Sequence, residues 1–330
     1  MMEVQDGAEL CFPQLLNTSC RRPTSSGFQA VFLKILLSSF SLLTVAPNLL
    51  VIISVSHFRQ LHTPTNLLLF SLAVSDFLVG LVVMPGAVLQ QTSCWFLGDF
   101  MCFLCHYISF IITSSSVGNM VLVSVDRYVA ICDPLHYTTR ITVRRVKLCV
   151  CLCWFFSALF SIVFTKDEVT QPGKHNSCQG ECVFAIDYIS GLVDFVLNFI
   201  VPVTLIIILY MRVFVVAVSQ ARAMRSHIAA VTLQVSLTLT SKKSELKAAR
   251  TLGILVVVFL ICLCPYYWVS LAGYISPNTS AELFVLSLLH FNSCLNPVIY
   301  ALFYPWFRKA IKLIVTLQIL QPGSCDANIL

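Results

Sequence analysis

The chain has 330 residues, of which 58% are hydrophobic and only 11% are charged, and its net charge is +6. Soluble domains carry about 25% charged residues, so this composition excludes a soluble globular protein, and lipid must cover much of the exterior. The positive charge does not indicate a nucleic-acid partner, because the basic residues cluster beside the ends of apolar segments. We therefore expect an all-α membrane protein.

Seven segments are long and apolar enough to cross a bilayer as helices, for which about 20 mostly apolar residues are needed. In chain order they are 31–56, 65–90, 101–132, 147–165, 188–216, 248–274 and 283–304. A shorter amphipathic stretch follows at 305–318. This pattern predicts three parts, namely an extracellular N-terminus over 1–30, a seven-transmembrane helix bundle over 31–304, and an amphipathic helix 8 with a cytoplasmic tail over 305–330.

Lys and Arg predict the orientation of the bundle, because cytoplasmic loops carry an excess of both. Most of them fall on the side that includes Arg127, which is then cytoplasmic, and the N-terminus of this multi-pass plasma membrane protein is extracellular. Asn17, in Asn17-Thr18-Ser19, becomes a glycosylation acceptor on the outer side. Cys325 follows the amphipathic stretch and is a candidate for palmitoylation.

Six cysteines fall on the outer, oxidising side, where disulfides form. They are Cys11, Cys20, Cys94, Cys102, Cys178 and Cys182. Spacing alone does not determine how they pair. Neither a zinc-spaced Cys/His set nor a glycine-rich phosphate loop occurs in the sequence, so no metal site is predicted from these motifs.

Polar motifs lie in a fixed order on the seven predicted spans. Charged groups inside a bilayer are costly and are usually functional. The set comprises Asn48, Leu72-Ala73-Val74-Ser75-Asp76, Asp126-Arg127-Tyr128, Trp154, Pro202 with Tyr210, Cys262-Leu263-Cys264-Pro265, and Asn296-Pro297-Val298-Ile299-Tyr300. Each motif is weak alone, but the whole set in this order resembles the rhodopsin-like (class A) G-protein-coupled receptors.

Within these receptors the chain resembles the trace amine-associated receptors, most of which are olfactory receptors for amines. The resemblance is carried by Cys94-Trp95-Phe96-Leu97-Gly98-Asp99, by Cys178-Gln179-Gly180-Glu181-Cys182 and by the segment 300–310. It implies a small-molecule amine as ligand, a heterotrimeric G protein of the stimulatory or olfactory type as partner, a rise in cyclic AMP, and no enzymatic activity. It also implies the disulfides Cys102–Cys182 and Cys20–Cys178, with Cys11 and Cys94 left to pair or to stay free.

The amine anchor departs from the usual aminergic pattern. Amine receptors usually place an aspartate seven residues after the third-helix cysteine, where this chain has Ser109. Asp194, eight residues before Pro202, is a different acid at the depth of the ligand cavity, and no Lys or Arg lies near it on the same helix. A carboxylate without a counterion there attracts a cation. Some fish members of the family resemble this arrangement, with the acid on the fifth rather than the third helix.

Further residues complete the predicted ligand site. Asn198 lies one turn below Asp194 on the same face. Aromatic rings can hold a cation on their faces, and the candidates are Phe195, Tyr266, Tyr267, Phe291, Tyr107 and Trp268. Ser109, Thr113 and His290 offer hydrogen bonds. A single acid favours a monoamine, although Glu181 or Asp187 could supply a second carboxylate for a diamine.

Several alternatives stay open. Asp194 could face a water-filled crevice or be held neutral by hydroxyls, and each aromatic residue could serve helix packing. Ser109 and Leu263, which stands where a tryptophan is usual, favour a peptide, lipid or other non-amine ligand instead. A transporter is disfavoured because no repeat relates the two halves of the chain.

The resemblance also implies how the signal passes. Arg127 pairs at rest with Asp126 and with Glu245, and it is freed for the G protein when the sixth helix moves outward. The switch set is Asp126, Arg127, Tyr128, Tyr210, Glu245, Asn296, Pro297 and Tyr300. Asp76, Asn292, Ser293 and Asn296 form a mid-membrane cluster, which in this family holds Na⁺ and water at rest. A structural polar network without Na⁺ is the alternative, and no other cofactor is expected.

Overall fold

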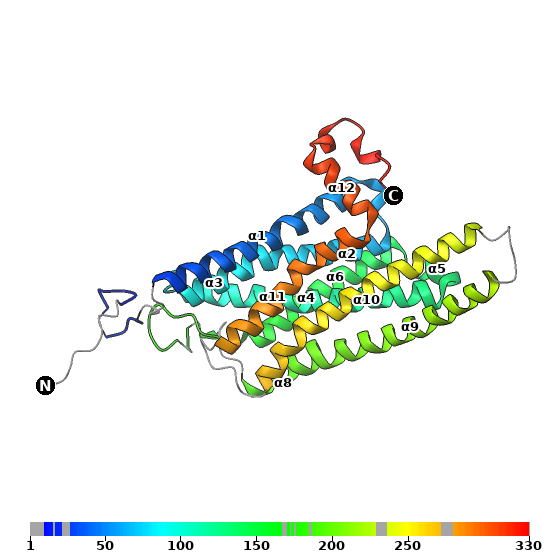
Figure 1. Cartoon of the computed structure of the whole chain (residues 1–330). Coiled ribbons are helices and arrows are strands. Elements are labelled where there is room, and N and C mark those ends of the chain that lie inside the picture. The colour runs from blue at the N-terminus through cyan, green and yellow to red at the C-terminus, as the bar shows by residue number, and fades with distance from the viewer. Residues whose placement is uncertain are drawn as a thin grey trace.

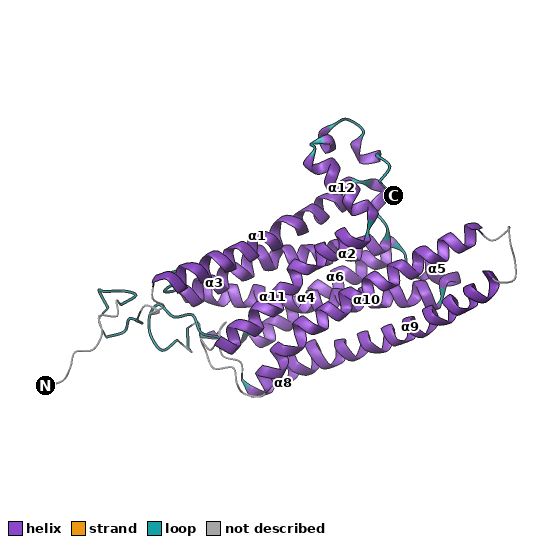
Figure 2. Ribbon diagram, viewed as in Figure 1, coloured by secondary structure: helices purple, strands orange, loops and turns teal. Residues whose placement is uncertain are grey.

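The computed structural model describes residues 10–15, 17–21, 27–166, 170–171, 173–174, 176–184, 187–228, 236–271 and 280–329, without the side chains at 27–34, 91–92, 220–228, 236–252, 280–283 and 302–303. The described chain forms an elongated bundle of long helices that lie side by side (Figures 1 and 2). Within these described ranges, seven helical segments are long and apolar enough to cross a membrane. The predicted fold class, a seven-transmembrane helix bundle, is therefore confirmed.

The helices follow one another in the predicted order. They are α1 Gly27–His57, α2 Pro64–Leu78 continued by the π-helix η2 Val79–Val83 and α3 Met84–Thr92, α4 Gly98–Cys132, α5 Tyr137–Arg140, α6 Val143–Phe164, α8 Tyr188–Asp194 continued by the π-helix η4 Phe195–Ile200 and α9 Val201–Ile228, α10 Ser236–Leu271, α11 Ser280–Phe303 and α12 Pro305–Val315. Short 3₁₀ turns lie at η1 Arg59–Leu61, η3 Pro134–His136, η5 Gln318–Leu320 and η6 Ser324–Asp326.

Two helices extend further than their apolar stretches. The fifth span continues through α9 to Ile228, where 216 was expected, and α10 begins at Ser236 rather than at 248. The added turns are polar and basic, with Lys242, Lys243 and Lys247 in α10. A hydropathy window ends where lipid ends, whereas backbone hydrogen bonding lets a helix continue into water.

Local sequence chemistry sets the helix starts. Thr63 and Thr142 cap α2 and α6, because their hydroxyl oxygens accept from the backbone N–H groups of Asn66 (3.3 Å) and Arg145 (3.4 Å). Pro64 occupies the first position of α2, where no amide hydrogen is needed. On α12, Trp306, Phe307 and Ala310 are buried, so the amphipathic stretch lies with its apolar face against the bundle.

Polar side chains join the helices inside the bundle. The indole N–H of Trp154 (α6) donates to Ser71 (α2) at 3.1 Å, and the Ser71 hydroxyl donates to Asn119 (α4) at 2.9 Å. Gly80 allows α1 and η2 to approach closely, since a Cβ atom there would lie 2.9 Å from a Val45 methyl carbon and 3.1 Å from the Ser41 carbonyl oxygen. Ser41 donates to the Gly80 carbonyl across this contact at 2.6 Å.

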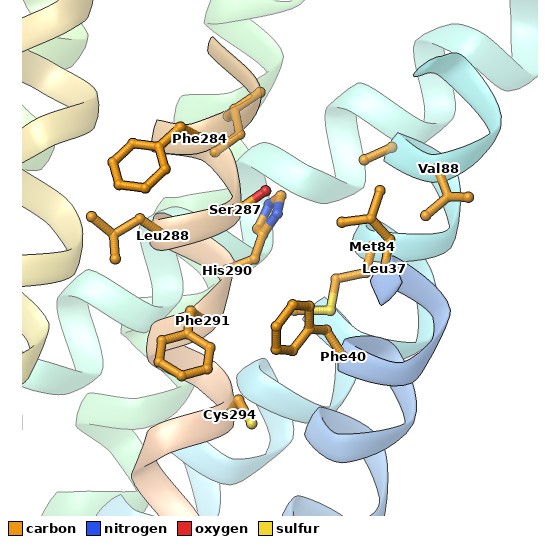
Figure 3. Close-up of a pocket in the computed structure, with 12 residues that line it drawn as sticks. Leu37, Phe40, Met84, Val88, Phe284, Ser287, Leu288, His290, Phe291 and Cys294 are labelled. Atoms are coloured by element: carbon orange, nitrogen blue, oxygen red, sulfur yellow. The ribbon is translucent and has the colours of Figure 1, made fainter. Parts of the chain in front are cut away.

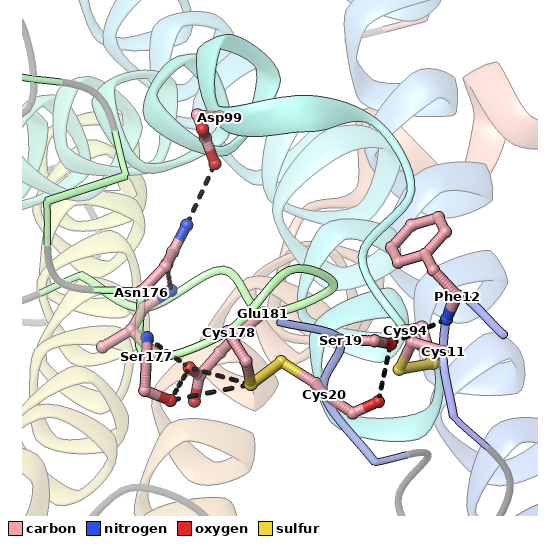
Figure 4. Close-up of a disulfide and its surroundings, with 11 residues drawn as sticks. Cys11, Phe12, Ser19, Cys20, Cys94, Asp99, Asn176, Ser177, Cys178 and Glu181 are labelled. Atoms are coloured by element: carbon pink, nitrogen blue, oxygen red, sulfur yellow. Dashed lines mark hydrogen bonds between the residues drawn. A yellow bond between two sulfur atoms is a disulfide. The ribbon is translucent and has the colours of Figure 1, made fainter. Parts of the chain in front are cut away.

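Three disulfides join segments at one end of the bundle, which we call the cap end (described residues 10–15, 17–21, 93–99 and 176–184), and two of them fasten the N-terminal segment. The structure contains Cys102–Cys182 and Cys20–Cys178, the two pairings that the resemblance implies. It also joins Cys11 to Cys94, which the sequence left open. Figure 4 shows the cap end, where Asn176 donates to Asp99 (3.0 Å).

At the opposite end, the chain after α12 folds back onto the connection between α1 and α2. Ser324 lies within hydrogen-bonding distance of His57 (3.0 Å), and Asp326 pairs with Arg59 at 3.4 Å. Ile329 is buried, with its backbone N–H directed to the side-chain oxygen of Gln60 (3.4 Å). We call this the Arg127 end, because α4 brings Arg127 to it.

Candidate functional site

Asp194 ends α8, six residues after the start of the helix, which places it about 9 Å along the axis at 1.5 Å per residue. Its carboxylate accepts from the Asn198 amide at 2.8 Å and from the Tyr267 hydroxyl at 3.4 Å. Among the residues that the structure describes, no Lys, Arg or His forms an ion pair with it. The acid therefore points into the bundle and meets only neutral donors there.

The π-helix η4 begins immediately after Asp194. Wider turns of this kind often mark functional positions, because they redirect side chains. Within this stretch Asn198 reaches Asp194, while Phe195 and Phe199 both contact Tyr267 of α10. The fifth span thus presents an acid, an amide and two rings toward the sixth span.

Aromatic rings surround the carboxylate on the α10 side. Phe199 and Tyr267 stack with centroids 4.6 Å apart, and both are buried. Phe195 lies 5.9 Å from Tyr267, and Tyr266 meets Tyr267 edge-on at 5.2 Å. The structure thus brings Asp194, Asn198, Phe195, Tyr266 and Tyr267 together, and it adds Phe199, which sequence reasoning missed although it lies one turn after Phe195.

Among the residues that the structure describes, no hydrogen bond or ring contact joins Ser109, Thr113 or Tyr107 to Asp194. Ser109 donates to the Cys105 carbonyl of its own helix at 2.7 Å, and Thr113 lies one turn further along α4. Tyr107 stacks on Phe103 and faces α6, with its hydroxyl directed to the Ala158 carbonyl at 3.5 Å. Ser109 thus donates its hydroxyl within its own helix, and it forms no hydrogen bond to another helix in the described part of the chain.

The seventh-span candidates line a different cavity. His290 and Phe291 face α1 and α3, and no residue near Asp194 lines this cavity with them. Phe291 packs edge-on against Phe40 of α1, with centroids 5.8 Å apart. Trp268 is 68% exposed on the outside of α10, so it contributes nothing to the group around Asp194.

The second carboxylates considered for a diamine lie nearer the cap end. Glu181 accepts from the backbone N–H (3.0 Å) and the hydroxyl (2.6 Å) of Ser177, and it lines a polar cavity of about 500 Å³ with Asp99. Asp187 caps α8 by accepting from Ser190, and these hydrogen bonds lower the pKa of Asp187. Neither acid contacts Asp194.

The residues predicted to form the switch centre on a buried ion pair. Arg127 contacts the carboxylate of its neighbour Asp126, and both side chains are buried at the Arg127 end. Thr65 of α2 bridges the pair, because its hydroxyl lies 3.0 Å from Asp126 and accepts from Arg127 at 2.6 Å. The pairing expected at rest between Arg127 and Asp126 is present. The expected partner Glu245 has its side chain outside the described residues.

Tyr137, on α5, closes the other side of the ion pair. Its hydroxyl donates to Asp126 at 2.9 Å and lies 3.3 Å from the Thr65 hydroxyl. Burial raises the pKa of Tyr137, and the Asp126 carboxylate raises it further, so the hydroxyl remains a donor at neutral pH. Sequence reasoning missed Thr65 and Tyr137. The only signal for Tyr137 in the sequence was an aromatic residue in the short connection that follows Asp126-Arg127-Tyr128.

Three tyrosines have hydroxyl oxygens that are buried and unsatisfied within the described part of the chain. Among the described residues, the hydroxyls of Tyr210, Tyr300 and Tyr304 have no hydrogen-bond partner. Tyr210 lies opposite Gly253 of α10, and Tyr300 packs edge-on against Phe307. A buried unsatisfied hydroxyl costs about 1–3 kcal/mol, so each of these groups gains if the helices rearrange to provide a partner.

The remaining residues of the predicted switch contribute to packing or to the cluster around Asp76. Tyr128 packs with Ile131 and Val213, between α4 and α9. Pro297 lies inside α11, and Asn296, next to it, extends toward α2. The deeper residue that could replace the missing tryptophan, Phe259, is buried beside Leu263 in the main core.

The predicted mid-membrane cluster is assembled around Asp76. The carboxylate is fully buried and accepts from the Asn296 amide at 2.7 Å. Asn48 ties α1 to α11 by donating to the Ser293 carbonyl at 2.9 Å. Four buried oxygens have no partner among the described residues, namely those of Asp76 (Oδ1), Asn48, Asn292 and Asn296.

These unsatisfied oxygens fit the cation that the resemblance implies. Hard cations bind carboxylate and amide oxygens, often together with water. Three side chains, Asp76, Asn292 and Asn296, would offer oxygen ligands to Na⁺, and the carboxylate would supply the negative charge. Water alone could also satisfy these acceptors, so the donor set is compatible with both expected alternatives.

Comparisons with known proteins agree with this architecture. The family model "7 transmembrane receptor (rhodopsin family)" matches residues 47–300. The trace amine-associated receptor 13c of Danio rerio is 37% identical over 98% of this chain and 97% of its own length. Trace amine-associated receptor 8a of Rattus norvegicus is 38% identical (97% and 96% covered), and trace amine-associated receptor 1 of Macaca mulatta is 35% identical (94% and 95% covered).

Both the family model and near-full-length relatives of this identity thus agree with the motifs and with the seven helices. The chain is not an enzyme, and it belongs to the trace amine-associated receptors of the rhodopsin family.

Proposed function

We propose that the chain is a receptor for monoamines that binds the ligand ammonium at Asp194. One observation carries the proposal: the Asp194 carboxylate points into the bundle, accepts only from Asn198 and Tyr267, and has no cationic partner among the described residues. The names of the relatives, all trace amine-associated receptors, support the same ligand class.

The electrostatic gain is large enough for selectivity. An ammonium about 4 Å from the carboxylate gains about 4 kcal/mol at an effective dielectric constant of 20, before the cost of desolvation. The rings of Phe195, Phe199 and Tyr267 add cation–π attraction and cover an alkyl or aryl chain. A neutral ligand of the same shape receives only the second contribution.

A single positive charge suits this site better than two. Ser109 occupies the usual acidic position on α4 and directs its hydroxyl to its own helix. Glu181 and Asp187 are engaged by Ser177 and Ser190 nearer the cap end. A diamine would leave its second ammonium without a carboxylate beside Asp194.

Ligand binding then shifts the bundle toward a state that engages a heterotrimeric G protein of the stimulatory or olfactory type, which raises cyclic AMP. Binding can do this only if the active state holds the ligand more tightly than the resting state. Asn198 and Tyr267 connect Asp194 to the fifth and sixth spans, and these spans also carry Tyr210 and Glu245 toward Arg127. Breaking the Asp126–Arg127 pair would release the cation for the partner.

The proposal also covers the orientation of the chain in the membrane, its glycosylation and its Na⁺ site. The cap end lies outside the plasma membrane, Asn17 carries a glycan, and the basic residues of the Arg127 end contact anionic lipid. Asn17 is exposed, as glycosylation requires. The cluster around Asp76 holds Na⁺ and water in the resting state. Olfaction is the sensory role that we assign by family resemblance.

The test uses cells that express the full chain, with cyclic AMP as the readout, and a panel of amines paired with neutral alcohols of the same skeleton. We expect responses to amines only. Asp194→Asn removes the charge and keeps the shape, so potency should fall about 10- to 150-fold, as expected for losing a charge-assisted hydrogen bond of about 1.5–3 kcal/mol.

Asp187→Asn is the matched control, because it makes the same chemical change seven residues earlier on the same helix, where asparagine still caps well. Ser109→Ala serves as a second control. Both should respond like the unmodified chain once surface expression is equal. An unchanged amine response in Asp194→Asn would contradict the proposed anchor.

A further inference from the structure

A second cavity lies on the other side of the bundle from the fifth span. It has a volume of about 250 Å³ and lies between α1, α3 and α11 (Figure 3). Its described lining is mostly apolar and includes Leu37, Phe40, Met84, Val88, Phe284 and His290. None of the described lining residues forms a hydrogen bond with Asp194, and none of the residues grouped around Asp194 lines this cavity.

Contacts between helices close the cavity toward the Arg127 end. Phe40 and Phe291 meet edge-on across the α1–α11 boundary, at 5.8 Å between centroids. The Cys294 thiol, which also lines the cavity, points to the Leu43 carbonyl at 3.7 Å. None of the described residues that line the space belongs to the polar cluster of Asp76.

His290 is the polar group that makes this space chemically specific. Figure 3 shows its ring extending from α11 into the space that faces α1 and α3, close to Ser287. Among the residues that the structure describes, none forms a hydrogen bond with the ring. An imidazole inside an apolar enclosure loses its water, and that loss is compensated only when a partner arrives.

The lining selects a ligand without charge. None of the described lining residues is acidic or permanently basic, so an ammonium or a carboxylate would enter without a counterion. A neutral imidazole offers one donor and one acceptor, and the nearby Ser287 hydroxyl can do both. An alcohol group also donates and accepts, so it matches His290 in either tautomer.

We propose that this cavity binds a neutral, membrane-soluble alcohol, with its apolar chain between α1, α3 and α11 and its hydroxyl on His290. The cavity is below the usual 300–1,000 Å³ of drug-sized sites, which suits a chain of several carbons rather than a whole phospholipid or a peptide. The site does not depend on the amine proposal, because it shares no residue with the group around Asp194.

The experiment uses the purified full chain in lipid nanodiscs and a photoreactive, diazirine-bearing 1-octanol, with labelled peptides identified by mass spectrometry. We expect saturable labelling of peptides from α1, α3 and α11 that excess 1-octanol suppresses. Ala87→Trp fills the cavity and should abolish this labelling. Leu81→Trp is the matched control on the same span, because Leu81 is exposed outside the bundle, and it should label like the unmodified chain.

His290→Phe keeps a ring of similar size and removes the hydrogen bond, so the concentration for half-maximal labelling should rise about tenfold. This variant keeps the proposal testable if Ala87→Trp does not fold. Labelling that neither saturates nor changes in His290→Phe would mean simple partition into lipid, and it would overturn the proposal.

Asp194→Asn separates the two sites. We expect its octanol labelling to equal that of the unmodified chain even if its amine response is lost. Competition by an amine in the unmodified chain that disappears in Asp194→Asn would instead indicate one continuous cavity, and it would overturn the inference of a separate alcohol site.

Discussion

Tyr137→Phe tests whether the ion pair at the Arg127 end restrains the receptor. The substitution removes one hydroxyl and keeps the ring in place. Asp126 then loses the donor at 2.9 Å and keeps Thr65 and Arg127 as partners. We expect the resting state, which contains this hydrogen bond, to become less stable relative to an active state that lacks it.

The size of the effect follows from the geometry. A hydrogen bond to a charged group contributes about 1.5–3 kcal/mol, and the lower end applies because Tyr137 is only half-buried. A change of about 1.4 kcal/mol shifts a two-state ratio tenfold. Ligand-independent signalling should therefore rise about tenfold from a low basal level, because the ratio of active to resting receptor rises by that factor.

The assay is nucleotide exchange on the coupled G protein without ligand, normalised to receptor number at the cell surface. Tyr188→Phe is the matched control, because it makes the same chemical change at a residue that is 82% exposed at the other end of the bundle, away from the ion pair. Basal signalling in Tyr137→Phe that equals or falls below that of Tyr188→Phe would refute the restraint.

Gly80→Ala should lower thermal stability in detergent by about 1–3 kcal/mol, because the added methyl group meets first-helix atoms at 2.9–3.1 Å. Gly86→Ala is the control and should melt like the unmodified chain, because its added methyl group has its nearest neighbour, the Cys105 sulfur, at 4.0 Å. Hydrogen bonds from Ser190 lower the pKa of Asp187, so their stabilisation is present above the ordinary pKa and is lost as pH falls through the lowered one. In a melting series from pH 6 to pH 3, which spans the ordinary carboxyl pKa near 4, the melting temperature should fall as the pH falls, and it should fall less steeply in Asp187→Asn. Equal slopes of melting temperature against pH in the two proteins would contradict this prediction. Asp76→Asn should abolish any rise in melting temperature between potassium and sodium buffers, and a rise that persists would argue for a network without Na⁺.

The seven spans could be predicted because lipid imposes a simple demand on the sequence. Each helix must remain apolar for the thickness of the bilayer, and this requirement is visible in a single chain. The ends were less predictable, since α9 and α10 continue beyond lipid as polar helices. Their hydrogen bonds are internal to the backbone and leave no hydropathy signal.

The group around Asp194 was predicted in part because its members lie on two helices with familiar spacing. Asp194 and Asn198 share a face by periodicity, and Tyr267 follows the proline of the sixth span. His290 was predicted for the same site; in the structure it lines a cavity that the described residues around Asp194 do not share, and its part in amine binding stays a prediction. Periodicity gives the face of a helix, whereas the neighbour that this face meets depends on how the helices pack.

Contacts between distant segments were the least accessible. Thr65, which lies 61 positions before Asp126, and Tyr137, which lies 11 positions after it, both form hydrogen bonds with its carboxylate. The bond between Cys11 and Cys94 depends on how the cap end folds. Such contacts depend on how distant segments come together in the folded chain, and residue types and spacing in a single sequence do not reveal this.

The wide turn η4 has a consequence for comparing receptors. Each residue of an α-helix advances about 100° around the axis, so the extra residue of a π-helical turn puts the two halves of the fifth span out of phase by about that angle. In a relative with an uninterrupted α-helix, an acid eight residues before the proline would point in another direction. Ligand preferences transferred by counting from that proline therefore hold only between receptors that share the turn, and deleting one residue within 195–200 would rotate Asp194 away from Tyr267 while leaving Tyr210 where it is.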